Sequence, residues 1–124
     1  QKNFNVSATE GQLKKLYYGL VRYDMIITER TEMENFIKVF KDDWNIHESK
    51  IYFKLDSPSC REFYELLKVH FPINSLTIID FFKRSDTIRR EDGNPYTYNT
   101  VKDAKSRTPI TKRSDDLKDI FSGL

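Results

Sequence analysis

The sequence is poor in cysteine, glycine and long apolar runs, and each shortage excludes a class of protein. Its 124 residues include one cysteine and two histidines, which excludes an internal disulfide framework and disfavours a conventional structural zinc site. Its four glycines form no phosphate-cradling loop. Neither a run of about 18 apolar residues nor the apolar stretch of a signal peptide is present. We therefore expect a cytoplasmic protein with no membrane span, metal or cofactor.

Residue patterns typical of catalysis are also missing. Cys60 and His70 fall on one predicted helix, and ten helical residues hold them about 15 Å apart. Two pairs of adjacent aspartates lie at residues 42–43 and 115–116. The side chains of adjacent residues point apart, so neither pair forms a carboxylate dyad. We therefore predict a protein that is not an enzyme and has no small-molecule substrate.

Aromatic residues are plentiful in this chain. Nine Phe, seven Tyr and one Trp can build a core from few positions, because each large ring buries much apolar surface. The length suits one independent core. We expect a single domain over residues 1–124, with a flexible N-terminal segment at residues 1–6.

Two capping boxes predict helix starts. Ser7 with Glu10, and Thr31 with Glu34, match the S-x-x-E pattern. The first precedes an apolar stripe with helical spacing, and the second precedes another that runs to about Lys41. The first stripe consists of Leu13, Leu16, Tyr17, Leu20 and Val21.

Three further helices follow from similar signals. Ser57 as N-cap and Pro58 at the first helical position predict a third helix, which Pro72 ends. Residues 76–82 are apolar almost all round and predict a central fourth helix. Ser114, followed by two acids, opens a short last helix.

Two short β-branched segments predict strands. Residues 51–55 alternate in period two, and residues 26–28 are their natural partner, because a lone strand leaves backbone groups unpaired. The fold class is therefore α+β and predominantly α-helical, with four to five helices and a minor sheet of two or three short strands.

The densest turn signal lies at residues 92–95, which read Asp-Gly-Asn-Pro. The flanks 87–90 and 96–101 suit a hairpin that forms a wing around this turn. In the alternative interpretation, the fourth helix runs on to Arg90 and the turn ends it.

Positive charge is concentrated in residues 83–113. This basic, turn-rich segment holds nine basic and four acidic residues, a net charge of +5, in a chain whose net charge is +2. Arginine and lysine beside hydroxyl and amide side chains suit contacts with phosphates. A solvated tail that is basic without a function has the same composition. The candidate nucleic-acid-binding residues are Arg84, Arg89, Arg90, Lys102, Lys105, Arg107, Lys112 and Arg113.

The order of four segments carries a family resemblance. They read LKKLYYGLVRYDMIITERTEMENFIKVF, KIYFKL, SCREFYELLKVHF and REDGNPYTYNTVKDA, with Phe36 and Phe40 spaced F-x-x-x-F and Ile51 and Phe53 spaced I-x-F. This order resembles small helical proteins carried by mobile and conjugative elements of Bacteroidetes, of which RteC-like regulators are the best described. The resemblance implies a helical fold with winged-helix character and a role in transcription regulation of element transfer.

Two functions follow as hypotheses. The first is a non-enzymatic, DNA-binding or RNA-binding regulatory domain that uses residues 83–113 for phosphate contacts. The alternative is a protein-interaction module without nucleic-acid binding, in which exposed rings dock a partner or a second copy of the chain. The rings we expect to be exposed are Tyr18, Tyr23, Tyr52 and Tyr64.

Overall fold

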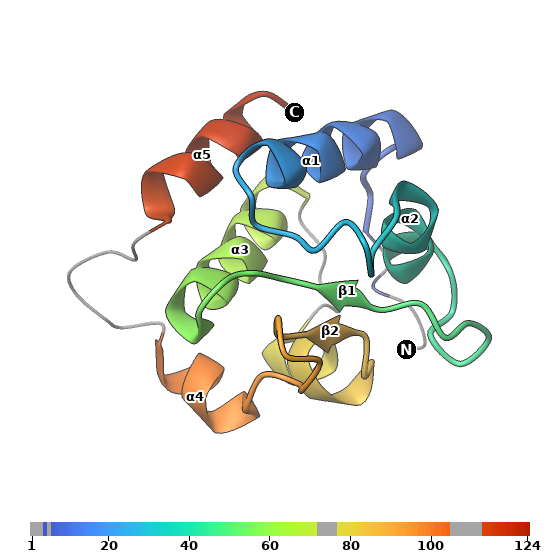
Figure 1. Cartoon of the computed structure of the whole chain (residues 1–124), viewed down its shortest axis with the longest axis vertical. Helices are drawn as coiled ribbons and strands as arrows, with labels where there is room; N and C mark the ends of the chain where they lie inside the picture. Colours follow the sequence, from blue (N-terminus) through green and yellow to red (C-terminus); the bar gives the residue numbers. More distant parts are fainter. Residues whose placement is uncertain (1–3, 5, 72–76, 105–112) are drawn as a thin grey trace.

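Helices dominate the part of the chain that the structure, a computed structural model, describes, namely residues 4, 6–71, 77–104 and 113–124 (Figure 1). Two short strands, β1 and β2, form a parallel pair. The predominantly helical α+β class is therefore confirmed. In chain order the elements are α1 (Glu10–Arg22), α2 (Met33–Lys41), β1 (Ile51–Tyr52), α3 (Ser57–His70), the π-helix η1 (Asp80–Arg84), β2 (Ile88–Arg89), α4 (Tyr98–Asp103) and α5 (Ser114–Ser122).

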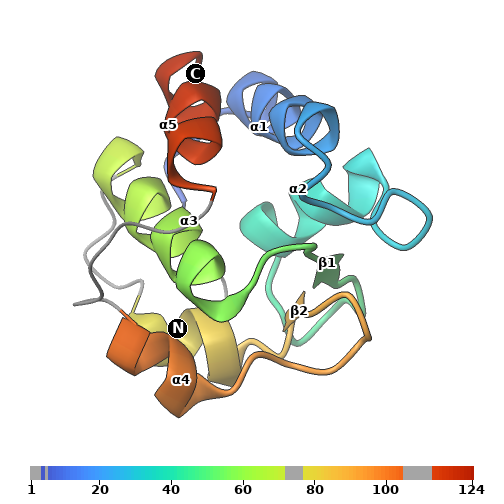
Figure 2. The ribbon, with the colours of Figure 1, turned by 60° about the vertical axis from the view of Figure 1, so that its left-hand side comes forward.

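The molecule has two ends joined by α3. Helices α1 and α5 lie at one end and η1 and α4 at the other, in both views (Figures 1 and 2). Helix α3 packs against both α4 and α5. None of the described helices has the length and apolar character needed to cross a lipid bilayer.

The N-cap of the first helix lies two residues after the predicted one. Thr9 is the N-cap, its Oγ1 accepts a hydrogen bond from the Gln12 amide at 3.1 Å, and Gln12 Oε1 accepts one from the Thr9 amide at 2.9 Å. Gln serves as well as Glu in a capping box. The predicted box of Ser7 and Glu10 is therefore wrong. The apolar stripe behind it is buried as expected except for Val21, which is partly buried.

The second and third caps also differ from prediction. The predicted cap Thr31 is fully buried, and its hydroxyl accepts a hydrogen bond from the Tyr52 amide at 2.9 Å, so Glu32 caps α2 instead. Asp56 rather than Ser57 caps α3, because its carboxylate accepts from the Ser59 amide at 2.9 Å.

Strand β1 has neighbours on both edges. It pairs in parallel with β2 in the register Ile51 to Ile88 and Tyr52 to Arg89. An antiparallel bridge joins Ile26 to Phe53 on the other edge, which confirms the predicted pairing of residues 26–28 with 51–55.

The predicted hairpin around residues 92–95 does not form. A single bridge joins Arg89 to Pro95, and residues 98–103 then form helix α4 instead of a strand. Burial of Val101 against the core and the pairing of β2 with β1 account for this outcome. The wing is therefore wrong, and so is the alternative helix to Arg90, because η1 ends at Arg84. Residue 76 of the predicted fourth helix lies outside the described residues.

Aromatic rings form the centre of the core. Phe63 contacts the rings of Phe53, Phe81 and Phe121 at centroid distances of 5.1, 6.4 and 5.6 Å. Phe4 is 1% exposed and Val6 6% exposed. Their burial differs from the flexible segment expected at residues 1–6, because Phe4 offers a large apolar surface that the core absorbs.

Candidate nucleic-acid interface

The π-helix η1 presents two neighbouring cations, Lys83 and Arg84, and both side chains are exposed. Arg84 makes an ion pair with Asp80 at 3.2 Å, in which the arginine side chain is 64% exposed and the aspartate side chain only 10%. Isolated π-helical turns occur frequently at functional sites. The π-helical turn therefore indicates that the surface around Lys83 and Arg84 is a candidate functional site.

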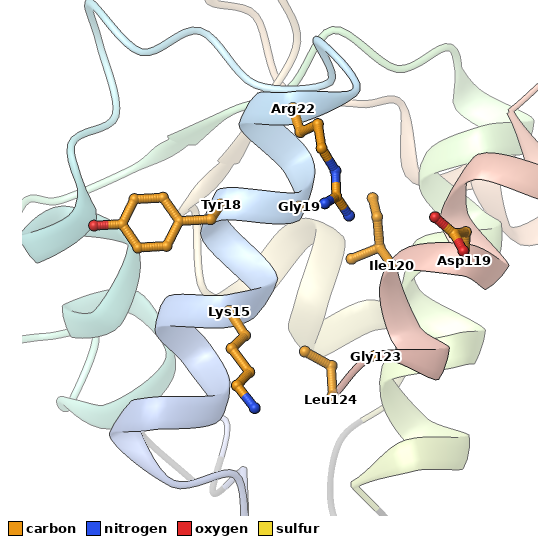
Figure 3. Close-up of a pocket in the computed structure, with 8 residues that line it drawn as sticks. All are labelled: Lys15, Tyr18, Gly19, Arg22, Asp119, Ile120, Gly123 and Leu124. Atoms are coloured by element: carbon orange, nitrogen blue, oxygen red, sulfur yellow. The ribbon is translucent and has the colours of Figure 1, made fainter.

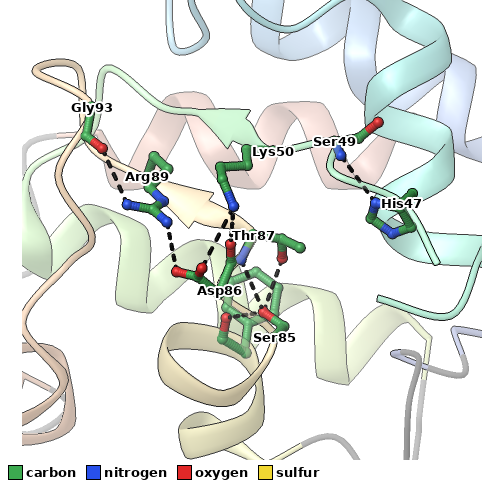
Figure 4. A network of polar contacts seen from close by, with 9 residues as sticks. His47, Ser49, Lys50, Ser85, Asp86, Thr87, Arg89 and Gly93 are labelled. Carbon is green, nitrogen blue, oxygen red and sulfur yellow. Dashed lines mark hydrogen bonds and ion pairs between the residues drawn. The ribbon is translucent and has the colours of Figure 1, made fainter. Parts of the chain in front are cut away.

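A polar network follows η1 and joins it to Lys50, the residue before β1 (Figure 4). Asp86 has a φ of +54°, a left-handed conformation that is strained for a residue with a side chain. The Lys50 ammonium donates to the Asp86 carbonyl oxygen at 2.7 Å, and the Arg89 guanidinium donates to the Asp86 carboxylate at 2.6 Å. The hydroxyls of Ser85 and Thr87 are 2.9 Å apart in the buried interior. These bonds hold Asp86 in its unusual backbone conformation.

Two hollows flank this network, and Asp86 lines both. The first, of about 430 Å³, lies between η1 and the segment before α4, and its lining residues are Phe82, Lys83, Asp86, Pro95, Tyr96, Thr97, Tyr98 and Asn99. The second, of about 530 Å³, lies between the loop before β1 and the turn after η1. Its lining residues are Trp44, Asn45, His47, Glu48, Ser49, Lys50, Arg84, Ser85, Asp86 and Thr87.

Three of the eight predicted site residues are held by carboxylates. Arg84 is paired with Asp80 as described, and Arg89, whose side chain is 17% exposed, is paired with Asp86. Arg113 lies 3.9 Å from Asp116 and donates to the Tyr23 carbonyl oxygen at the α1 and α5 end. The structure therefore does not bring Arg113 together with the other two.

The remaining predicted residues are divided between separate regions. Arg90 is exposed and lines a hollow that also contains Glu91 and Asp92. Lys102 is exposed, and its ammonium lies 5.8 Å from the centre of the Tyr98 ring. Lys105, Arg107 and Lys112 lie outside the described residues.

Residues 44–50 contribute to the site, although no signal in the sequence points to them. Trp44, His47 and Lys50 come from a loop far from the basic segment in sequence, yet they line a hollow together with Arg84. Only the parallel pairing of β1 with β2 places Lys50 beside Asp86. No short-range pattern in the sequence carries that information.

The rings proposed for protein interaction have different surroundings. Tyr64 is 2% exposed, so its predicted exposure is wrong, and burial raises its pKa to about 12. Tyr23 donates a hydrogen bond to Asp119, and the Arg30 guanidinium lies 3.9 Å from the centre of the Tyr52 ring. Tyr18 is 63% exposed.

Tyr18 lies beside a third hollow, of about 450 Å³, between α1 and α5 (Figure 3). Gly19 lets the two helices approach closely there, because a Cβ at this position would lie 2.7 Å from Ile120 Cγ2. Lys15 and Arg22 also line the hollow. This end of the molecule is separate from the one that carries η1 and α4 (Figure 1).

No family model, curated protein or solved structure matches this chain. The resemblance to RteC-like regulators therefore stays a hypothesis.

Proposed function

We propose that this chain is a non-enzymatic nucleic-acid-binding protein whose phosphate contacts come from η1 and α4. We define the η1–α4 surface as Lys83, Arg84 and Lys102, together with Tyr98 and Asn99. One observation carries the proposal: Lys83 lines the 430 Å³ hollow, and the Lys102 ammonium lies 5.8 Å from the centre of the Tyr98 ring, which lines the same hollow. Both lysines are exposed and have no carboxylate partner within the described residues.

The composition of this surface suits a phosphate backbone. Ammonium and guanidinium groups attract phosphates at long range, and hydroxyl and amide groups fix the position of the backbone. Tyr98, which lines the hollow and lies beside Lys102, adds an aromatic ring on which a base can stack. The resemblance to RteC-like regulators supports a role in transcription regulation on a mobile element, and the single unpaired Cys60 fits the reducing cytoplasm.

Salt-dependent binding tests this proposal. We expect fluorescence anisotropy to show saturable binding of labelled single-stranded RNA or random duplex DNA at about 50 mM salt, weakening strongly by about 200 mM. Three phosphate contacts predict a slope of log affinity against log salt of about −2 for single strands and about −3 for duplexes. Replacing both Lys83 and Lys102 with alanine lowers the magnitude of the slope by about 1.5.

The matched control replaces two exposed lysines at the other end of the molecule. Lys15→Ala with Lys118→Ala removes the same charge from α1 and α5. We expect this variant to keep most of the affinity. Absence of binding at low salt, or equal losses in the two double variants, contradicts the proposal.

The alternative function, a protein-interaction module, is favoured by one observation, the 63% exposure of Tyr18 beside the hollow between α1 and α5. It predicts association that salt does not weaken. Sedimentation velocity over a range of protein concentrations at both salt concentrations distinguishes it from nucleic-acid binding.

A further inference from the structure

We propose that the second hollow seats one nucleotide of a single strand, with its phosphodiester at His47, Lys50 and Arg84 and its base beside Trp44. We call it the His47 pocket and define it by these four residues. The inference rests on the proposed function and extends it from phosphate attraction to a choice of single strand over duplex.

His47 supplies a hydrogen-bond donor that has no acceptor. Its Nδ1 accepts a hydrogen bond from the Ser49 amide at 3.1 Å (Figure 4). A neutral imidazole that accepts at Nδ1 carries its proton on Nε2. This Nε2 is buried and has no hydrogen-bond partner among the described residues. Because an unpaired buried donor is costly, the position favours a ligand with an acceptor oxygen.

The charges around the pocket favour a ligand with no more than one negative charge. Lys50 and Arg84 are cationic, whereas Glu48 and Asp86 are anionic. Arg84 is also paired with Asp80 at 3.2 Å. Asp86 is already paired with Arg89 at 2.6 Å and lies 3.6 Å from the Lys50 ammonium. This near balance suits a phosphodiester, with its single charge, better than a doubly charged phosphate monoester.

The size and the aromatic wall of the pocket suit a base. About 530 Å³ is within the range of small-molecule pockets. The Trp44 ring contacts Phe4 at a centroid distance of 5.5 Å, which helps to fix its position. Stacking of a base on an aromatic ring is sequence-tolerant and requires an unpaired base. A duplex keeps its bases stacked and paired, so it cannot place one here.

The pocket adjoins the η1–α4 surface. Lys83 lines the first hollow and Arg84, the next residue, lines the second. A strand that crosses η1 therefore meets the two hollows in succession.

Trp44 offers a direct test because it is the single tryptophan of the chain. We expect a short oligothymidine strand to quench Trp44 fluorescence over the same concentrations that raise the anisotropy of the labelled strand. A duplex of the same length leaves the tryptophan emission unchanged. Both measurements are made on the full chain at about 50 mM salt.

Two substitutions at His47 isolate its Nε2 proton. His47→Asn keeps an acceptor for the Ser49 amide and removes the Nε2 donor, and we expect about tenfold weaker strand binding. His47→Gln extends an amide N–H towards the lost Nε2 position and restores part of the affinity. Lys118→Ala, on α5, is the control and leaves the affinity unchanged.

The outcomes separate this inference from the proposed function. Anisotropy that rises while Trp44 emission stays constant overturns the pocket and leaves phosphate binding by the η1–α4 surface intact. Absence of any anisotropy change at low salt overturns both. Because quenching is measured on the unmodified chain, the result does not depend on how the His47 variants fold.

Discussion

Tyr96 links the segment after β2 to Leu55, which lies just before α3. Its ring is 3% exposed, and its hydroxyl donates a hydrogen bond to the Leu55 carbonyl oxygen at 2.6 Å. Cys60 lies beside it and is fully buried. Burial raises the pKa of both groups well above their usual ranges, because the interior disfavours their charged forms.

These two raised pKa values predict a loss of stability in alkali. The unfolded chain ionises Cys and Tyr at their ordinary pKa values, near 9 and 10, while the folded chain keeps both protonated. The unfolded state therefore gains stability above about pH 9. We expect Tyr96→Phe to lower the free energy of unfolding by about 1 kcal/mol at pH 7. Between pH 7 and pH 10.5, the free energy of unfolding of this variant falls less than that of the unmodified protein. Urea unfolding at the two pH values measures both effects.

Tyr18→Phe is the control, because Tyr18 is exposed and its substitution leaves the alkaline decline as it was. If the free energy of unfolding of Tyr96→Phe falls in alkali as much as that of the unmodified protein, buried Tyr96 does not contribute to the alkaline loss of stability. Burial also raises the pKa of Tyr64 to about 12, so part of the alkaline loss of stability remains in every variant.

At the scale of elements, α4 depends on a contact from outside its own sequence. It has six residues, too few for a stable isolated helix. Arg61 of α3 is 7% exposed, and its guanidinium donates to the carbonyl oxygens of Val101 and Lys102 at 3.0 and 3.1 Å. Arg61 also pairs with Glu65. A buried arginine thus satisfies carbonyl groups that the end of α4 leaves without helical partners.

Substitution of Arg61 is predicted to loosen α4 selectively. Arg61→Met keeps most of the apolar stem and leaves the two carbonyl groups without their donor, at a cost of about 1–3 kcal/mol. We expect faster hydrogen exchange at the Val101 amide, which donates to the Thr97 carbonyl oxygen at 3.1 Å, and little change at Leu20 in α1. Lys68→Met on the same helix is the control. Equal exchange at Val101 in both variants contradicts the role of Arg61.

At the scale of the whole molecule, Phe4 joins parts that are far apart in sequence. Its ring contacts Phe40 of α2 at 5.7 Å, Trp44 at 5.5 Å and Phe81 of η1 at 5.2 Å. It therefore supports both the core and one wall of the His47 pocket.

Loss of this ring is predicted to destabilise the entire fold. Phe4→Ala leaves a cavity among the other rings, and we expect the free energy of unfolding to fall by about 3–5 kcal/mol. Urea unfolding followed by circular dichroism measures the loss, and Trp44 emission reports the exposure of its ring. Phe4→Leu fills most of the space and costs less. A loss below about 1 kcal/mol for Phe4→Ala shows that this segment is not anchored as described.

Local patterns predicted the helices better than their ends. Apolar spacing located the buried faces of α1 and α2, and Ser114 begins α5 as predicted. The caps shifted because several residues near each helix start can accept the same amide hydrogen bond. Thr31, for example, bonds to the Tyr52 amide instead of capping α2. A one-dimensional pattern cannot show which acceptor is already engaged across the fold.

The candidate site was only partly predictable. The concentration of basic residues in 83–113 is a property of the sequence, but the structure pairs Arg89 and Arg113 with carboxylates and places them in different regions. Which cations remain exposed depends on neighbours that only folding supplies. The same holds for His47 and Trp44, which reach the site through the pairing of β1 with β2.

The sequence by itself determined the helical α+β class, the aromatic core and the excess of positive charge near residue 90, because these follow from composition and from spacing over a few residues. The tertiary structure alone decided that residues 98–103 form a helix and that Phe4 is buried. It also decided that Lys50 lies beside Asp86. Each of these outcomes depends on contacts between residues distant in sequence, whose free energies outweigh the weak local preferences of a short segment.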